Sequence, residues 1–304
     1  MPSTAIKHKA QDADSIRAIE KIIPGVATSD GAGVKLRRYI GSRTLDYLDP
    51  FLLFDEFSSD DPKDYIAGFP PHPHRGMETV TYMIDGRVEH GDSMGNRGVI
   101  GKGDAQWMTA GSGIIHSEMP AMEKGLLRGL QLWVNLAAKN KMNQPRYREL
   151  KAAAIPVVNS NGASVRIIAG EYHGTKGAFA DIAGDPLYLD VTLRAGVRFA
   201  VDVPKTHNAF AYVLEGAGNF GESPEAVSRK SLAVFRQDGN ATLLARAHEN
   251  ELRFILAAGA PLNEPVARGG PFVMNTEAEI RTAWIEYQNG TFIKSKARID
   301  ERTG

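Results

Sequence analysis

Gly68-Phe-Pro-Pro-His-Pro-His-Arg-Gly-Met-Glu-Thr-Val-Thr-Tyr-Met-Ile84 joins a pair of histidines to a run of β-branched and aromatic residues. A run of this kind, bounded by glycine and proline, predicts a β-strand from Glu78 to Ile84. Six further runs predict strands in the same way: Arg128 to Leu136, Ser164 to Ala169, Leu187 to Leu193, Ala209 to Leu214, Ser231 to Phe235 and Leu252 to Ala257. Short strands separated by closely spaced turn residues are typical of a sandwich or barrel, so we expect an all-β protein.

Helical periodicity is scarce by comparison. We expect two short helices, Ser15 to Lys21 near the start of the chain and Thr276 to Tyr287 near its end. Thr276 can cap the second helix, and Glu277 and Glu279 suit the positive end of the helix dipole.

The length of 304 residues favours two domains. Thr81-Tyr-Met-Ile-Asp-Gly86 resembles Ala211-Tyr-Val-Leu-Glu-Gly216, each being an apolar strand closed by an acidic residue and a glycine. The alternative is two unrelated strand–turn units, because the match is short. We expect two copies of one barrel, in an N-terminal domain (1–140) and a C-terminal domain (161–304) joined by residues 141–160.

Composition excludes several classes of function. Lys and Arg number 36, as do Asp and Glu, so the formal net charge is zero and nucleic acid is not an expected partner. The absence of cysteine excludes disulfides, thiolate metal sites and a cysteine nucleophile. The chain begins without the apolar segment of a signal peptide and contains no stretch of about 18 apolar residues. We therefore expect a cytoplasmic protein without a membrane segment, and a monomer.

Two pairs of residues predict a metal site. Side chains two apart on a strand point to the same face, so His72 and His74 can bind a common ion. Farther along, His116 and Glu118 repeat this spacing with an imidazole and a carboxylate. Between the pairs, the glycines of Gly101 to Gly113 permit the turns that bring one pair to the other.

Three imidazoles and a carboxylate suit Fe(II), Mn(II), Co(II), Ni(II) or Cu(II), and Zn(II) is also compatible with these ligands. A six-coordinate ion would keep two positions for water, dioxygen or substrate. Glu78 is a rival to Glu118, because it has the same parity as His72 and His74. The other five histidines lack a partner at a comparable spacing, and we expect no metal role for His8, His90, His173, His207 and His248.

The motifs resemble those of the pirin family of bicupins, most densely from Asp49 to Asn135 and more thinly through the C-terminal half. The segments that carry the resemblance are Asp49-Pro-Phe-Leu-Leu-Phe-Asp55, His72-Pro-His-Arg-Gly-Met-Glu-Thr-Val80, Gly103-Asp-Ala-Gln-Trp-Met-Thr-Ala-Gly111, Gly113-Ile-Ile-His-Ser-Glu-Met-Pro120, Gly129-Leu-Gln-Leu-Trp-Val-Asn135 and Gly270-Pro-Phe-Val-Met-Asn275. The segment from Glu222 to Arg229 does not match the family pattern.

The resemblance implies two cupin β-barrels, with one metal, usually iron, in the N-terminal barrel. It assigns the ligand roles to His72, His74, His116 and Glu118, and so prefers Glu118 to Glu78. The C-terminal positions that the weak repeat makes equivalent to His72 and His74 are Asp202 and Pro204. The C-terminal barrel is therefore expected to be metal-free.

The resemblance also implies two kinds of function. The first is a quercetin 2,3-dioxygenase, which opens a flavonol ring with O₂ and releases carbon monoxide, with Glu118 as the candidate base. The second is a redox-sensing protein that binds a transcription factor or a metabolic enzyme without turnover. A third hypothesis, apart from these two, is that the metal only stabilises the barrel. For the dioxygenase, Phe51, Phe54, Trp107, Met108 and Met119 could line a flat aromatic pocket. The alternative, which is favoured for any single one of them, is an ordinary place in the barrel core.

Overall fold

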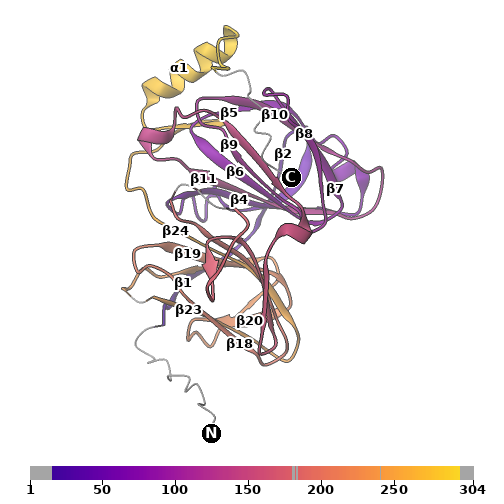
Figure 1. Ribbon diagram of the computed structural model, residues 1–304, viewed down its shortest axis with the longest axis vertical. Coiled ribbons are helices and arrows are strands. Elements are labelled where there is room, and N and C mark those ends of the chain that lie inside the picture. Colours follow the sequence, from indigo (N-terminus) through magenta and orange to yellow (C-terminus); the bar gives the residue numbers. More distant parts are fainter. Residues whose placement is uncertain (1–15, 180–181, 183, 240, 295–304) are drawn as a thin grey trace, which may run out of the picture.

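The computed structural model describes residues 16–179, 182, 184–239 and 241–294. Two β-barrels of similar build lie one above the other, the N-terminal barrel in indigo to magenta and the C-terminal barrel largely in orange (Figure 1). All seven strands expected from the sequence are present, and two of them have the expected bounds, β17 (Leu187–Leu193) and β22 (Ser231–Phe235). The all-β prediction with two cupin domains is therefore confirmed.

The N-terminal barrel consists of two antiparallel sheets. Its larger sheet contains, in spatial order, β12 (Arg146–Leu150), β9 (Ala105–Thr109), β6 (Met77–Asp85), β11 (Leu127–Asn135), β4 (Phe51–Ser59), β3 (Val34–Ile40) and β2 (Val26–Asp30). Its smaller sheet contains β5 (Phe69–His74), β10 (Ile114–Pro120), β7 (Arg87–Asp92) and β8 (Arg97–Gly101).

The C-terminal barrel repeats this arrangement. Its larger sheet contains β1 (Ile19–Pro24), β22, β19 (Asn208–Glu215), β24 (Leu252–Gly259), β17, β14 (Ala163–Ala169) and β13 (Val157–Ser160). Its smaller sheet contains β18 (Arg198–Asp202), β23 (Thr242–Ala247), β20 (Ala217–Phe220) and β21 (Ala226–Ser228). The third strand of each larger sheet, β6 or β19, carries one copy of the sequence repeat, so the repeat marks equivalent strands.

Strand β1 crosses from one half of the chain to the other. It precedes the N-terminal barrel in sequence but pairs with β22 of the C-terminal barrel, with Ile23 opposite Leu232. The helix expected from Ser15 to Lys21 is therefore wrong over its described part, because Ile19 and Lys21 belong to this edge strand. Strand β12 comes after the other strands of the N-terminal barrel in sequence and forms an edge of its larger sheet. The domain limits at 140 and 161 stay a prediction.

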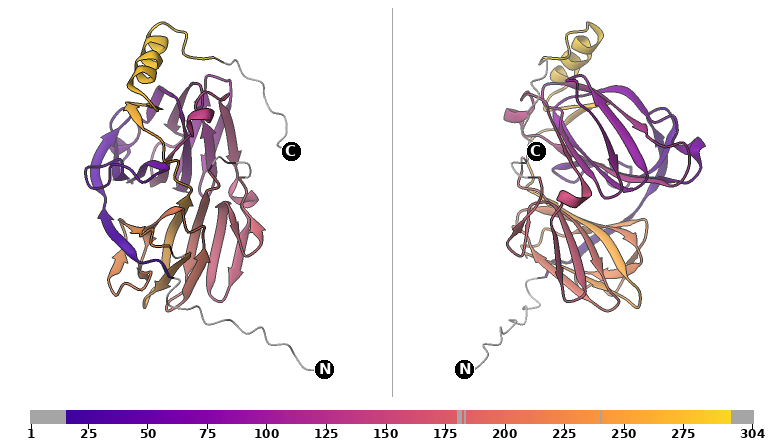
Figure 2. Two further views of the ribbon diagram at one scale, coloured as in Figure 1. Left: turned by 90° about the vertical axis from the view of Figure 1, so that its left-hand side faces the viewer. Right: turned by 45° about the vertical axis from the view of Figure 1, so that its right-hand side comes forward.

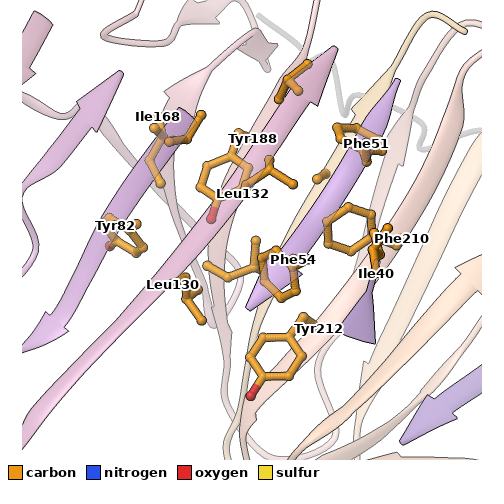
Figure 3. Close-up of a cluster of buried hydrophobic side chains, with 14 of the residues drawn as sticks. Ile40, Phe51, Phe54, Tyr82, Leu130, Leu132, Ile168, Tyr188, Phe210 and Tyr212 are labelled. Atoms are coloured by element: carbon orange, nitrogen blue, oxygen red, sulfur yellow. The ribbon is translucent and has the colours of Figure 1, made fainter. Parts of the chain in front are cut away.

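The two larger sheets pack face to face and bury the main hydrophobic core between the barrels (Figure 3). Side chains alternate along each strand, so Val80 and Tyr82 on β6 face this core while Thr81 faces the inside of the N-terminal barrel. The ring of Phe54 lies 5.1 Å from that of Phe210 in the opposite barrel. One face of each larger sheet thus joins the barrels, which leaves the other face to line a barrel interior.

The C-terminal segment returns to the N-terminal barrel. It contains β25 (Ala267–Gly269), β26 (Phe272–Met274) and helix α1 (Glu277–Gln288), which lies against the N-terminal barrel in yellow (Figure 2). Thr276 caps α1 and forms a capping box with Glu279, which confirms the predicted helix and its cap. Arg75, next to His74, is buried and binds Glu286 of α1 at 2.7 Å. The tail therefore packs beside the histidine pair.

The remaining elements are short. They are the hairpin of β15 (Glu171–Tyr172) and β16 (Thr175–Lys176) and the 3₁₀ turns at Pro62–Asp64, Ala138–Asn140 and Ala152–Ala154. No helix in the described part of the chain is long and apolar enough to cross a membrane.

Candidate metal centre

Neighbouring strands bring the two predicted residue pairs together. Strands β5 and β10 are antiparallel, with His116 opposite His72 and Ile114 opposite His74. Because alternate residues share a face, all three histidines project into the interior of the N-terminal barrel. The ring centroids are 4.8 Å apart for His72 and His74, 4.4 Å for His72 and His116, and 5.0 Å for His74 and His116.

Each of the first two imidazoles is oriented by a backbone carbonyl. His72 Nδ1 lies 2.8 Å from the carbonyl oxygen of Pro70, and His74 Nδ1 lies 3.4 Å from that of Pro271 in the C-terminal segment. A carbonyl can only accept, so Nδ1 carries the hydrogen and Nε2 keeps its lone pair. This is the tautomer that a metal ligand needs.

In the third imidazole, too, Nδ1 faces a neighbouring group and Nε2 is left for a metal. His116 Nδ1 lies 3.4 Å from Nδ1 of His90, while its Nε2 is buried without a hydrogen-bond partner. Nitrogen atoms of the three predicted histidine ligands lie within 4.8 Å of one another. A buried nitrogen without a partner is costly unless something binds it. The three residues therefore fit a metal ion.

Burial also keeps the rings of His74 and His116 neutral. Desolvation, followed by the nearby charge of His72, lowers the pKa of His74 to about 3. The pKa of His116 lies well below its usual value, first because of burial and then because of the neighbouring His74, His72 and His90. Neutral imidazole is the form that coordinates metals, so the rings do not have to lose protons before an ion binds.

Glu118 lines the same cavity as the first histidine pair, but its carboxylate already has two donors. Thr81 Oγ1 donates to Oε1 at 2.8 Å, and Gln131 Nε2 donates to Oε2 at 3.2 Å. Each carboxylate oxygen has a further lone pair, so these bonds still permit coordination. The fourth-ligand role of Glu118 stays a prediction, because the close group found among the described residues contains the three histidines and not Glu118.

Glu78 lies on the other face of the larger sheet. Its carboxylate accepts hydrogen bonds from Trp107 Nε1 at 3.0 Å and from Thr109 Oγ1 at 2.6 Å. The parity that made it a rival breaks at Gly76, which has a φ of 78° and turns the chain from β5 into β6. The geometry therefore favours Glu118 over Glu78.

A cavity of about 690 Å³ opens from the histidines into the N-terminal barrel. His72, His74, Glu118 and Gln131 form its polar wall, and Arg38 and Asp55 lie in its lining as an ion pair at 2.7 Å. The apolar wall consists mainly of Val34, Leu36, Phe57, Tyr65, Phe69 and Trp133. This volume is within the range of small-molecule sites.

The lining expected from the sequence differs from this one. Phe51, Phe54 and Trp107 belong to the core between the barrels. Met108 is fully buried beside Ile114. The larger sheet presents these aromatic residues to the C-terminal barrel, so they are structural, and none of the five expected residues lines the cavity.

His90 lies next to the three histidines, a position that the sequence analysis did not predict. It is fully buried on β7, and its ring lies 5.3 Å from that of His116. Its partner stands 26 residues away in sequence, on the adjacent strand β10. Only the pairing of the two strands, which sequence spacing does not give, could have revealed this contact.

The other histidines lie elsewhere. His173 stacks on Tyr172, His207 is buried in the C-terminal half, and His248 bonds Asn219. His8 is outside the described residues.

The C-terminal barrel has a different interior. Strands β18 and β23 correspond to β5 and β10 by their order in the smaller sheet, and Phe199 pairs with Ala245 in its core. Asp202 and Pro204, the counterparts expected from the weak repeat, are out of phase with this face. Apolar side chains such as Phe199, Val203 and Ala245 fill the interior of this barrel instead. The expectation that this barrel is metal-free stays a prediction.

Comparisons with known proteins agree with this architecture. The family model "Pirin" matches residues 33–134, and "Pirin C-terminal cupin domain" matches residues 188–293. A pirin-like protein of Solanum lycopersicum is 46% identical over 274 residues, covering 90% of this chain and 92% of that protein. A pirin-like protein of Caulobacter vibrioides is 44% identical over 280 residues, covering 91% and 99%. The solved structure of a quercetin 2,3-dioxygenase from Acinetobacter baumannii is 34% identical, with a TM-score of 0.83, covering 91% and 98%.

Proposed function

This chain belongs to the pirin family, and from that premise we propose that it is a metal-dependent dioxygenase that opens a flavonol-like ring with O₂. The observation that carries the proposal is the placement of two of the three histidines in the wall of the cavity. A metal that served only the fold would have no need of a cavity beside it.

His72, His74 and His116 would hold the ion through Nε2, with Glu118 as the fourth protein ligand. We propose Fe(II) as the native ion, because the donor set of three nitrogens and one oxygen suits it. When bound, the ion supplies Lewis acidity and open coordination positions that orient substrate and dioxygen.

Glu118 would take the proton of the substrate hydroxyl when its carboxylate loosens from the metal. A carboxylate with hydrogen-bond donors at both oxygens keeps a fixed direction, and Thr81 and Gln131 provide these donors. Proton transfer needs a base within hydrogen-bond reach, and Glu118 lies in the cavity wall where the substrate would sit.

The apolar wall would bind the flat rings and exclude water. Phe57, Phe69 and Trp133 lie in this wall. Aromatic side chains favour flat aromatic ligands through apolar contact and stacking. The polar groups are gathered around the histidines and at the Arg38–Asp55 pair, so they would fix the orientation of the ligand in the cavity.

Quercetin loss and O₂ uptake by protein loaded anaerobically with Fe(II) test the proposal. The His116→Ala variant is the negative control, and His248→Ala is the matched control for the loss of a histidine elsewhere. We expect turnover in the wild type and in His248→Ala, and none in His116→Ala. Absence of turnover with one ion bound per chain would contradict the proposal and favour the redox-sensing alternative.

A further inference from the structure

His90 occupies a closed site behind the three histidines. Strand β7 pairs with β10, placing His90 opposite Glu118 and Asp92 opposite His116. The imidazole of His90 is fully buried and does not line the cavity. Among the three histidines, its contact is with His116.

The tautomer of His116 determines which nitrogen of His90 must carry the hydrogen. If Nε2 of His116 binds a metal, the hydrogen of this ring must be on Nδ1. His90 Nδ1 lies 3.4 Å from that atom. A hydrogen bond between the two nitrogens then needs His90 Nδ1 to be the acceptor, with the hydrogen of His90 on Nε2.

The surroundings of His90 favour this tautomer. Gln106 Nε2 lies 2.8 Å from the same Nδ1 and donates to it, so the single lone pair of this nitrogen is shared between the donors Gln106 and His116. On the other side of the ring, Nε2 makes no hydrogen bond, but it lies 3.6 Å from the carboxylate Oδ2 of Asp92, whose negative charge favours a hydrogen on this nitrogen. Tyr147 stacks on the ring at 4.6 Å with an interplanar angle of 21°. Gln106 and Tyr147 thus hold the plane of the buried imidazole, and Gln106 and Asp92 favour the tautomer with its hydrogen on Nε2.

We propose that His90 is a positioning residue for the metal centre, which accepts the Nδ1–H of His116 and so holds Nε2 of His116 towards the ion. The inference rests on the proposed metal centre but does not depend on which reaction the centre performs. Groups that orient a metal-ligating histidine in this way typically change metal affinity by about 10- to 100-fold when they are removed.

Co(II) binding to the full-length protein tests the role without an activity assay. His90→Phe keeps a ring of similar shape but removes the acceptor, whereas His90→Asn can place Oδ1 near the position of Nδ1. We expect about 10- to 100-fold weaker Co(II) binding and an altered visible spectrum in His90→Phe, with most of the affinity restored in His90→Asn. Tyr147→Phe, which keeps the stacked ring and loses only its hydroxyl bond to Glu149, should bind like the wild type.

Two results would overturn the inference. One is wild-type affinity and an unchanged spectrum in His90→Phe. The other is binding in His90→Asn as weak as in His90→Phe, because the ring would then matter only for packing. Thermal unfolding of each metal-free variant shows whether it is folded.

A measurement on the wild type keeps the test independent of folding in the variants. In Zn(II)-loaded protein with ¹⁵N-labelled histidine, two-bond ¹⁵N–¹H correlations should show His90 protonated on Nε2 and His116 protonated on Nδ1. A hydrogen on Nδ1 of His90 would contradict the inference. Lack of dioxygenase turnover would leave these results intact, whereas a wild type that binds neither Co(II) nor Zn(II) would remove the metal centre and this inference with it.

Discussion

Asp55 on β4 and Gln131 on β11 are direct cross-strand partners on the inner face of the N-terminal barrel. The register continues through Thr81 on β6 to Gln106 on β9. These four residues form a polar band across a sheet whose other face contributes to the main hydrophobic core. The band lies opposite the strands that carry the histidines.

The polar band supports the candidate site at two points. Thr81 and Gln131 bind the carboxylate of Glu118, and Gln106 binds His90. Polar groups in a barrel interior are costly unless they are paired. Here Asp55 pairs with Arg38, and the other three pair with Glu118 or His90. The band is therefore expected to matter for function more than for stability.

Thr81→Val removes the donor to Glu118 with almost no change in shape. We expect about a 10- to 100-fold loss in turnover or metal affinity, because the carboxylate loses one of its two fixed bonds. Turnover and metal content of the purified variant measure this. Thr79→Val is the matched control, since Thr79 faces the same interior two residues away. Equal effects of the two substitutions would show that Thr81 has no special role.

Stability of the metal-free protein should fall as the pH is lowered. Burial lowers the pKa of His74 to about 3, against 6.5 for an ordinary histidine. Between these values the unfolded chain binds a proton that the native protein does not, so acid favours unfolding. Well inside this window the loss for one such group is about 1.4 kcal/mol per pH unit.

Urea unfolding of metal-free protein between about pH 7 and pH 4.5, within the window set by this shift, checks the expectation. His74→Asn should flatten the pH dependence, whereas His248→Asn, which changes an exposed histidine, should not. Parallel curves for the wild type and His74→Asn would show that His74 is not held neutral.

Phe210→Ala should destabilise the protein by about 3 to 5 kcal/mol, because it leaves a hole in the core between the barrels. Phe210 is fully buried and contacts the rings of Phe51 and Phe54. Denaturant unfolding measures the change. Ile285→Ala on the exposed side of α1 is the control, with an expected change within about 0.5 kcal/mol. A similarly small effect of Phe210→Ala would mean that the barrels do not depend on each other through this core.

Local patterns in the sequence were sufficient to predict seven of the strands, the helix cap at Thr276 and the pairing of His72 with His74. Each of these depends on residues a few positions apart. The strand from Ile19 to Pro24 could not be predicted in the same way, because it exists only through pairing with β22 more than 200 residues later.

The limits of sequence spacing are clearest at the candidate site. Glu78 has the right parity but the wrong face, because a positive φ at Gly76 changes the direction of the chain. Phe54 and Trp107 are aromatic and near the motifs, yet the strand alternation turns them towards the other barrel. His90 has no partner within a few residues, and only the register of β7 against β10 brings it to His116.

Metal content tests the central claim most directly. After anaerobic dialysis against Fe(II), the wild type, His173→Ala and His248→Ala should each hold one ion per chain. His116→Ala and Glu118→Ala should lose most of it, because each lacks a predicted ligand. Full occupancy in His116→Ala, or no bound ion in the wild type, would contradict the assignment of the metal centre.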